Sequence, residues 1–437
     1  MSEYRRPTIT KLSQHPENFN QPTIEKKEST RNEKLIQACK ELELKAEEIL
    51  RETYPKSEYA FHNIEHSKEV ADKVEEILRV IQSIDPKLVS DEDIAFARAE
   101  AMFHDIPQDR EQFGDTDYDP ITYSIKRRRG FNEELINPHD RTSESFIGNE
   151  QKAAIQFIEL IRTGPNAELF KDFTDEEIHL EFGSTYPDLD FRPLDNAPEH
   201  LQGLSIFTMT QPIAPKASIR GLALALSDLK EAGGNVTNKE LPHKKALKAG
   251  NDEFRELYKG FTVQIQMAIR NQQTFEEAII PPTRKNMLKT MLGWKRGQEE
   301  FYLGQERDLH TILENSVAIQ ESPKAEEIRQ ALRERYNGFE IITSGLRQEY
   351  LTLVDELDLK TENGSPLLDT ILQLDTIAMK LKNEASLLGE DNQQINALEA
   401  EAETIRQQSN HLKATYEEKL ASVSPRNFYR VLNAMGY

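Results

Sequence analysis

Apolar residues recur at steps of three and four along most of this chain, the spacing of one face of an α-helix. In residues 66–84 the apolar positions are Val70, Val74, Ile77 and Ile81, so this segment is expected to bury one face. The other segments that show this spacing before the last third of the chain are 33–51, 94–106, 149–161, 219–232, 253–272 and 287–310. Strict apolar–polar alternation, which is typical of strands, does not persist in any region. The pattern predicts an all-α fold.

Helix breakers and polar stretches divide these segments. Pro107 is expected to stop the third helix, because proline cannot continue the backbone hydrogen bonding. Residues 109–129 contain Gly, Pro and many charges and indicate a loop. Residues 164–200 are rich in Pro, Asp and Gly and favour short helices at most. Residues 1–33 are polar with little periodicity and predict a mobile tail.

The last third of the chain shows heptad-like spacing. Small or apolar residues alternate by three and four in two runs, which are Ile371, Leu374, Ala378, Leu381, Ala385 and Leu388, then Leu398, Ala402, Ile405, Ser409, Leu412 and Tyr416. The sequence 389–392 separates the runs as a turn, and 363–366 ends an earlier helix of about 325–359. Each run is short, so we expect a C-terminal helical bundle or antiparallel helical hairpin at 316–437, after a core domain at 34–315.

Composition narrows the class of protein. The 437 residues are 37% hydrophobic and 30% charged, with a net charge of −21. Such an acidic chain is not expected to be a general nucleic-acid binder, because those proteins neutralise phosphates with basic side chains. Cys39 is the only cysteine, which excludes an intrachain disulfide and suits a reducing compartment. We see neither a secretion signal nor a membrane span, and expect a cytoplasmic protein.

A pair of histidines raises the question of chemistry. The stretch "YAFHNIEHSKEV" places His62 and His66 four residues apart, on one face if the helix extends back to His62. His104 and Asp105 end the helix of 94–106, and Asp228 interrupts the apolar segment "GLALALSDL". Ionised carboxylates are seldom buried unless they are paired or bind a metal. These side chains suit a divalent cation, either Mn²⁺, Mg²⁺, Zn²⁺ or Fe²⁺. The alternative is that they are ordinary core or surface residues.

The order of these residues resembles the HD-domain superfamily of metal-dependent phosphohydrolases. The resemblance spans about residues 36–310 and is carried by "FHNIEHSKEV", "AEAMFHDI", "NEQKAAIQFI" and "LALALSDLKEAG". It implies that His66, His104, Asp105 and Asp228 bind the metal, with Asp105 at the catalytic centre. It also implies that His62 resembles the general acid of the cyclic-nucleotide phosphodiesterase branch.

Other residues have weaker support. The resemblance gives Glu150 the role of orienting water or substrate. The family usually shows N-E-x-x-S-A here, whereas this chain has "NEQKAA", so Ala153 stands where the serine is expected. Arg127 and Arg128 in "KRRRG", and Arg296 in "WKRGQEEFYLGQ", are candidate contacts for substrate phosphate. The alternatives are an exposed loop and a packing helix. Further histidines that a two-metal site would need are available at positions 139, 179 and 200.

Three functions are compatible with these features. The first is a metal-dependent phosphohydrolase or phosphodiesterase acting on a nucleotide or another small phosphoester by metal-activated water. The second is a non-catalytic interaction protein that uses residues 316–437 for a protein partner or for self-association. The third is a di-iron oxidase built on the same ligands. The combination of a polar tail, a hydrolase-like core and an acidic helical end also resembles bacterial effectors translocated into host cells.

Overall fold

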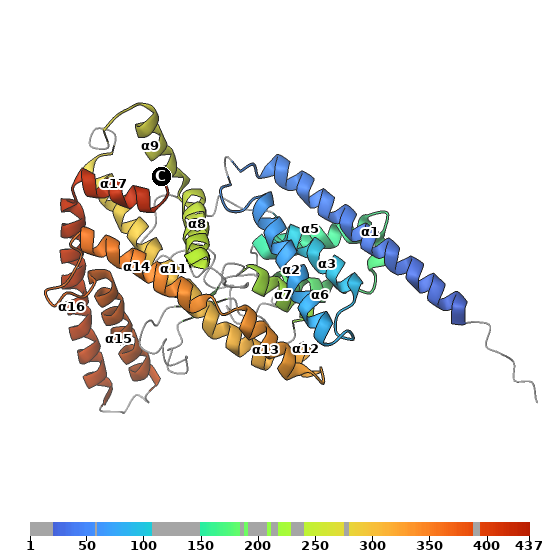
Figure 1. The fold of residues 1–437 in the computed structure, drawn as a ribbon. Coiled ribbons are helices and arrows are strands. Elements are labelled where there is room, and N and C mark those ends of the chain that lie inside the picture. Colours follow the sequence, from blue (N-terminus) through green and yellow to red (C-terminus); the bar gives the residue numbers. More distant parts are fainter. Residues whose placement is uncertain are drawn as a thin grey trace, which may run out of the picture.

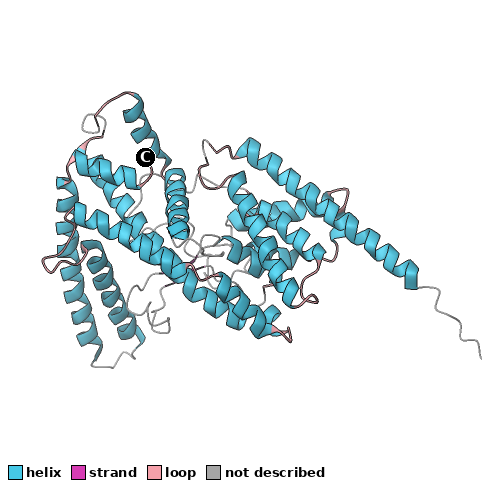
Figure 2. Cartoon of the chain, in the orientation of Figure 1, coloured by secondary structure: helices cyan, strands magenta, loops and turns pink. Residues whose placement is uncertain are grey.

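The protein is all-α in the computed structural model, as predicted (Figure 1; Figure 2). The structure describes residues 21–56, 59–106, 149–183, 188–190, 208–210, 217–228, 240–274, 279–387 and 394–437. Within these ranges the strands are a short antiparallel pair, β1 (Asp188–Asp190) and β2 (Thr208–Thr210). No described helix combines the length and apolar character that a membrane crossing needs.

Helices of the first half of the chain lie together on the right of Figure 1 and pack on one another. They are α1 (Gln21–Thr53), α2 (Ile64–Ile84), α3 (Asp91–Phe103), α5 (Asn149–Thr163), α6 (Asp175–Gly183) and α7 (Ile219–Asp228), with the 3₁₀ helix η2 (Ala167–Phe170). The predicted stripe of α2 is buried, as are the apolar residues of α7 from Leu222 to Leu226. Each fully buried Leu or Ile contributes about 1.5–3 kcal/mol of transfer free energy. The apolar periodicity therefore predicts the buried faces of α2 and α7 correctly.

The remaining helices follow from α8 onward. They are α8 (Glu240–Leu257), α9 (Lys259–Arg270), α11 (Pro281–Asn315), α12 (Val317–Gln320), α13 (Ala325–Arg335), α14 (Phe339–Glu356), α15 (Leu367–Leu387), α16 (Gln394–Ser422) and α17 (Pro425–Ala434). The heptad-like runs lie on α15 and α16, which pack side by side, except for Leu388, which lies outside the described residues. The predicted break at 363–366 is present as a turn, with Gly364 at a φ of +88° that favours glycine. The predicted turn at 389–392 lies outside the described residues.

Several predicted boundaries were wrong. Residues 21–33, expected in the tail, belong to α1, whose first turn tolerates Pro22. The helix predicted at 325–359 is divided at Tyr336–Gly338, and the one at 253–272 is divided at Tyr258. Apolar periodicity continues across both breaks, so it could not locate them.

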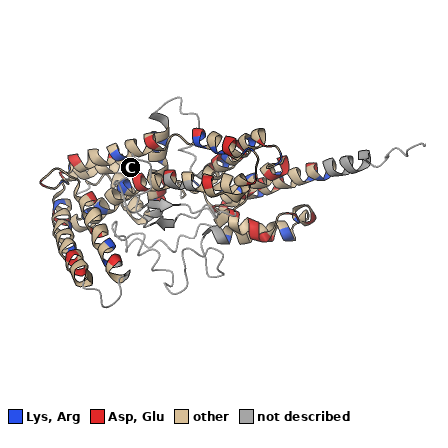
Figure 3. Ribbon diagram, turned by 90° about the horizontal axis from the view of Figure 1, so that it is seen from below, with Lys and Arg blue, Asp and Glu red and all other residues tan. Residues whose placement is uncertain are grey.

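Two apolar clusters form the interior, and α11 takes part in both. One cluster extends from Leu35 to Leu346 and the other from Phe254 to Met435. The N-terminal half of α11 packs in the second cluster and its C-terminal half in the first. The predicted domain boundary at 315/316 therefore falls inside the first cluster, where Leu313 and Ile319 are both buried. Figure 3 shows acidic and basic residues interspersed along the described helices.

Candidate metal centre

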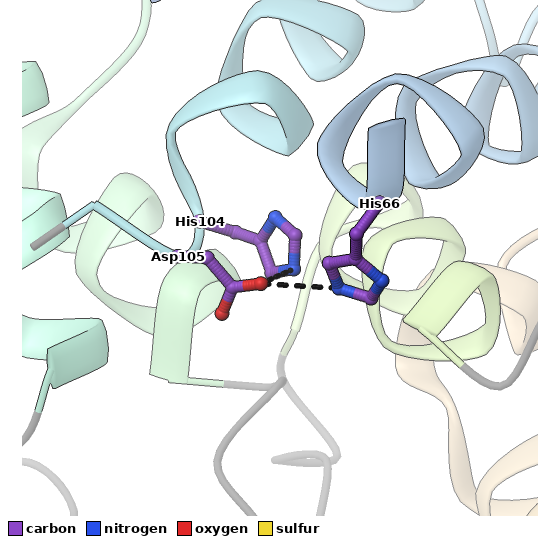
Figure 4. Close-up of side chains that lie close together, drawn as sticks. All are labelled: His66, His104 and Asp105. Atoms are coloured by element: carbon purple, nitrogen blue, oxygen red, sulfur yellow. Dashed lines mark ion pairs between the residues drawn. The ribbon is translucent and has the colours of Figure 1, made fainter. Parts of the chain in front are cut away.

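Two helix ends bring the candidate ligands together. Helices α2 and α3 pack against each other, and the connection of residues 85–90 reverses the chain between them. The N-terminal end of α2 therefore lies beside the C-terminal end of α3. His66 lies in the first turn of α2, and His104 and Asp105 follow the last residue of α3. The structure thus places three of the four predicted ligands at one point (Figure 4).

The two imidazoles point at one carboxylate oxygen of Asp105. His66 Nε2 lies 3.0 Å from Asp105 Oδ2, and His104 Nε2 lies 3.1 Å from the same oxygen. The possible ligand atoms of the group lie within 4.8 Å of one another. Neighbouring ligand atoms around a cation with bonds of about 2.1 Å are separated by ~3.0–3.4 Å. The separations within this group therefore fit donors arranged around one divalent ion.

The ring of His104 is oriented for ligation. Its Nδ1 lies 2.6 Å from the carbonyl oxygen of Ala101, one turn earlier. A carbonyl can only accept, so Nδ1 carries the proton and donates it, which leaves the lone pair of the neutral ring on Nε2. Histidines that bind metals are commonly held in this way by a backbone carbonyl. His104 is 2% exposed and His66 is 5% exposed, so both imidazoles face the interior.

Asp105 is held in its charged form. Burial disfavours the carboxylate, but without a metal the positive charges of His104 and His62 and the hydrogen bonds from His104 and His66 outweigh that effect. The pKa of Asp105 is consequently well below its usual range. An anionic oxygen that faces two imidazoles is a suitable ligand for a hard or borderline cation.

His62 lies near the group, but it is not on the helix. Asn63 caps α2, with its side-chain oxygen accepting from the backbone N–H of Glu65, and so α2 begins at Ile64. The expectation that His62 shares the helical face of His66 was therefore wrong. The rings of His62 and His66 are nevertheless 6.1 Å apart between centroids.

Glu256 of α8 holds the turn that carries His62. Its Oε2 accepts from the backbone N–H groups of Phe61 and His62, at 3.1 Å each, and its Oε1 lies 2.8 Å from His62 Nδ1. Burial disfavours protonation of His62, but the carboxylates of Glu256 and Asp105 overcome this and raise its pKa to about 10. His62 is therefore protonated at neutral pH, with Nδ1–H donating to Glu256.

Sequence reasoning missed Glu256. It lies 194 residues from His62 and does not share the helical face of Phe254, the buried aromatic residue two positions before it. A glutamate at such a position usually faces solvent, yet this side chain is buried. No pattern within α8 distinguishes it, because its partners come from a distant turn.

The backbones of Asp228 and Glu150 are described, but their side chains lie outside the described residues. Asp228 is the last residue of α7, and Glu150 is the second residue of α5. Helix α7 packs against α2 and α3. Arg220, in its first turn, contacts Asp93 at the end of α3 opposite His104. Helix α7 therefore runs from the N-terminal end of α3, which carries Asp93, toward its C-terminal end, which carries His104.

The other predicted site residues do not join the group. Arg296 is 5% exposed, and its guanidinium contacts Asp369 at 2.7 Å, Glu300 at 2.9 Å and Glu299 at 3.2 Å, which favours the packing alternative over a substrate contact. His179 is exposed on α6. Arg127, Arg128, His139 and His200 lie outside the described residues.

Comparisons with protein-family models, with curated proteins and with solved structures found no match. The functional assignment therefore rests on the chain's own residues and geometry.

Proposed function

We propose that this protein is a metal-dependent phosphoester hydrolase. The observation that carries the proposal is the convergence of His66, His104 and Asp105, which come from two helix ends and share one Asp105 oxygen. A set of two imidazoles and a carboxylate suits Mn²⁺, Zn²⁺ or Fe²⁺ better than it suits the all-oxygen preference of Mg²⁺.

Asp228 is proposed as the fourth ligand. It is the residue that the HD-like order H…HD…D requires, and α7 advances toward the end of α3 that carries His104. When bound, a divalent cation lowers the pKa of a coordinated water from about 15.7 to about 7 and polarises a phosphoryl oxygen.

His62 is proposed to handle the proton of the leaving group. Its pKa of about 10 keeps it protonated at neutral pH, and its Nδ1–H is occupied by Glu256. The Nε2–H remains to donate to the alkoxide oxygen as its bond to phosphorus breaks. Such a general acid contributes about 10²–10⁴-fold to the rate. Glu256 contributes by fixing the ring and favouring its charged form.

The substrate class follows from the resemblance to HD-domain hydrolases, whose substrates are nucleotides and other small phosphoesters. Glu150 would orient water or substrate, and Arg127 and Arg128 would bind its phosphates. Self-association or a protein partner at 316–437 stays a prediction beside this proposal.

A substrate screen tests the proposal. The purified chain is assayed with cyclic nucleotides, nucleoside monophosphates, deoxynucleoside triphosphates and a generic phosphodiester, each with Mn²⁺, Mg²⁺, Zn²⁺ or Fe²⁺. We expect turnover of at least one compound with at least one metal, and its loss in His104→Ala. Turnover that His104→Ala retains would place the activity elsewhere.

A further inference from the structure

The last turn of α7 is held by a residue from a distant part of the chain. The carbonyl oxygens in the last turn of a helix have no partner within the helix. One of them, the buried Leu226 oxygen, accepts the hydroxyl of Tyr336 at 2.5 Å, from 110 residues away. Leu226 is two residues before Asp228, the proposed fourth ligand. The hydrogen bond therefore acts on the backbone turn that carries this residue.

Tyr336 is itself held firmly. It follows α13, where its backbone N–H donates to the Leu332 oxygen at 3.0 Å, and its ring stacks on Phe339 with centroids 6.4 Å apart. The side chain is 3% exposed and belongs to the first apolar cluster. The preceding residue, Arg335, pairs with Glu76 of α2. The end of α13 thus contacts both α2, which carries His66, and α7.

The other end of α7 is fixed independently. The Ser218 hydroxyl accepts from the backbone N–H groups of Arg220 and Gly221 at 3.1 Å each, which caps the helix. Arg220 pairs with Glu181 at 2.9 Å and Asp93 at 3.0 Å. These contacts hold the start of α7, and the Tyr336 hydroxyl holds a carbonyl of its last turn.

We propose that Tyr336 is a positioning residue for the metal centre, acting through the Leu226 carbonyl on Asp228. This inference rests on the proposed function. Loss of the hydroxyl removes a hydrogen bond to a buried carbonyl and is expected to loosen the last turn of α7. Groups that hydrogen-bond metal ligands directly typically change metal affinity by about 10–100-fold, and the lower value applies here because Tyr336 acts through the backbone. We therefore expect Tyr336→Phe to weaken metal binding by about 10-fold.

Tyr350→Phe is the matched control. Tyr350 is 1% exposed, and its hydroxyl has no hydrogen-bond partner among the described residues. It lies in the second apolar cluster. The same chemical change there is expected to leave metal affinity at the wild-type value. Circular dichroism of both variants establishes that they are folded at the temperature of the titration.

Calorimetric titration with Zn²⁺ tests the inference on the full chain. The proteins are wild type, Tyr336→Phe, Tyr350→Phe, His104→Ala, Asp228→Ala and the double variant Tyr336→Phe, Asp228→Ala. We expect the tenfold loss in Tyr336→Phe alone and no additional loss when Asp228 is already absent, because the effect passes through that residue.

Two contrary results are distinguishable. Wild type and His104→Ala binding Zn²⁺ equally would overturn the proposed function and this inference with it. Binding that His104→Ala abolishes but Tyr336→Phe leaves unchanged would overturn the role of Tyr336 alone. An equal tenfold loss from Tyr336→Phe with and without Asp228 would show that the hydroxyl acts by another route, and would also overturn it.

Discussion

Two of the buried clusters of charged side chains in the described part of the chain differ in how their charges are balanced. At the junction of α11, α14 and α15, Arg296 and Arg347 face Glu299, Glu300 and Asp369. Each guanidinium nitrogen of Arg296 lies near a carboxylate oxygen. At the meeting of α2 and α3, by contrast, two imidazoles approach a single oxygen of Asp105.

This difference separates a structural cluster from a candidate site. A guanidinium satisfies carboxylates with its own N–H groups, so the first cluster is complete without a ligand. Imidazoles in their neutral form and a carboxylate can both direct lone pairs toward one point, and a cation is the partner that uses them all. Burial of charge alone does not indicate function; the kind of atoms that converge does.

The largest effect is expected from a ligand substitution. His104→Ala should reduce metal-dependent turnover by about 10³-fold or more, because the metal supplies several kcal/mol and each ~1.4 kcal/mol is a factor of ten. Turnover at saturating metal measures the effect. His179→Ala, which removes an exposed histidine, is the control. Equal turnover in the two variants would remove the distinction between the clusters.

Arg296→Ala should affect folding rather than chemistry. It removes one of the two guanidiniums that face the buried carboxylates, and breaking a buried pair in this way typically destabilises a protein by about 3–5 kcal/mol. Denaturant unfolding measures the loss, and metal content per folded chain should be unchanged. Arg333→Ala is the control, since Arg333 is more exposed and its pairs are worth about 0–1 kcal/mol. Metal loss in Arg296→Ala would show that the two clusters are coupled.

His62→Ala should reduce kcat by about 10²-fold while the chain keeps its metal. The reason is that His62 supplies a proton and is not one of the ligands. Parallel measurement of kcat and metal content separates the two roles. If metal content falls together with kcat, His62 belongs with the ligands.

The smallest effect is a pH-dependent change in stability at the Glu256–His62 contact. The pKa of His62 is raised from about 6.5 to about 10, so its stabilising contribution is complete below pH 6.5 and is lost as pH rises through about 10. Glu256→Gln keeps an acceptor for the two backbone N–H groups but removes the charge. It should cost about 1 kcal/mol near pH 6.

Denaturant unfolding with EDTA at pH 6, 8 and 9.5 measures this dependence. The difference between wild type and Glu256→Gln should shrink as pH rises. A difference of the same size at all three values would show that the charge of His62 does not stabilise this contact.

Some helices and site residues could be predicted from the sequence, and others could not. The apolar pattern located α2, α3 and α7. A helix with one buried face shows a periodic apolar stripe, and a helix buried on all faces shows a continuous apolar run. The pattern also indicated His66 and His104, whose polar atoms interrupt buried stripes. The roles of Glu256 and Tyr336 could not be predicted. Each acts on a backbone group more than a hundred residues away, and such a contact imposes no period on its own helix.

The central claim is that His66, His104 and Asp105 bind a divalent cation, and metal analysis of the purified chain tests it most directly. Wild type and the double variant His66→Ala, Asp105→Ala are saturated with Mn²⁺, Zn²⁺ or Fe²⁺, desalted and analysed by mass spectrometry. We predict that wild type retains at least one ion per chain and that the double variant retains one fewer. Equal metal content in the two proteins would contradict the claim.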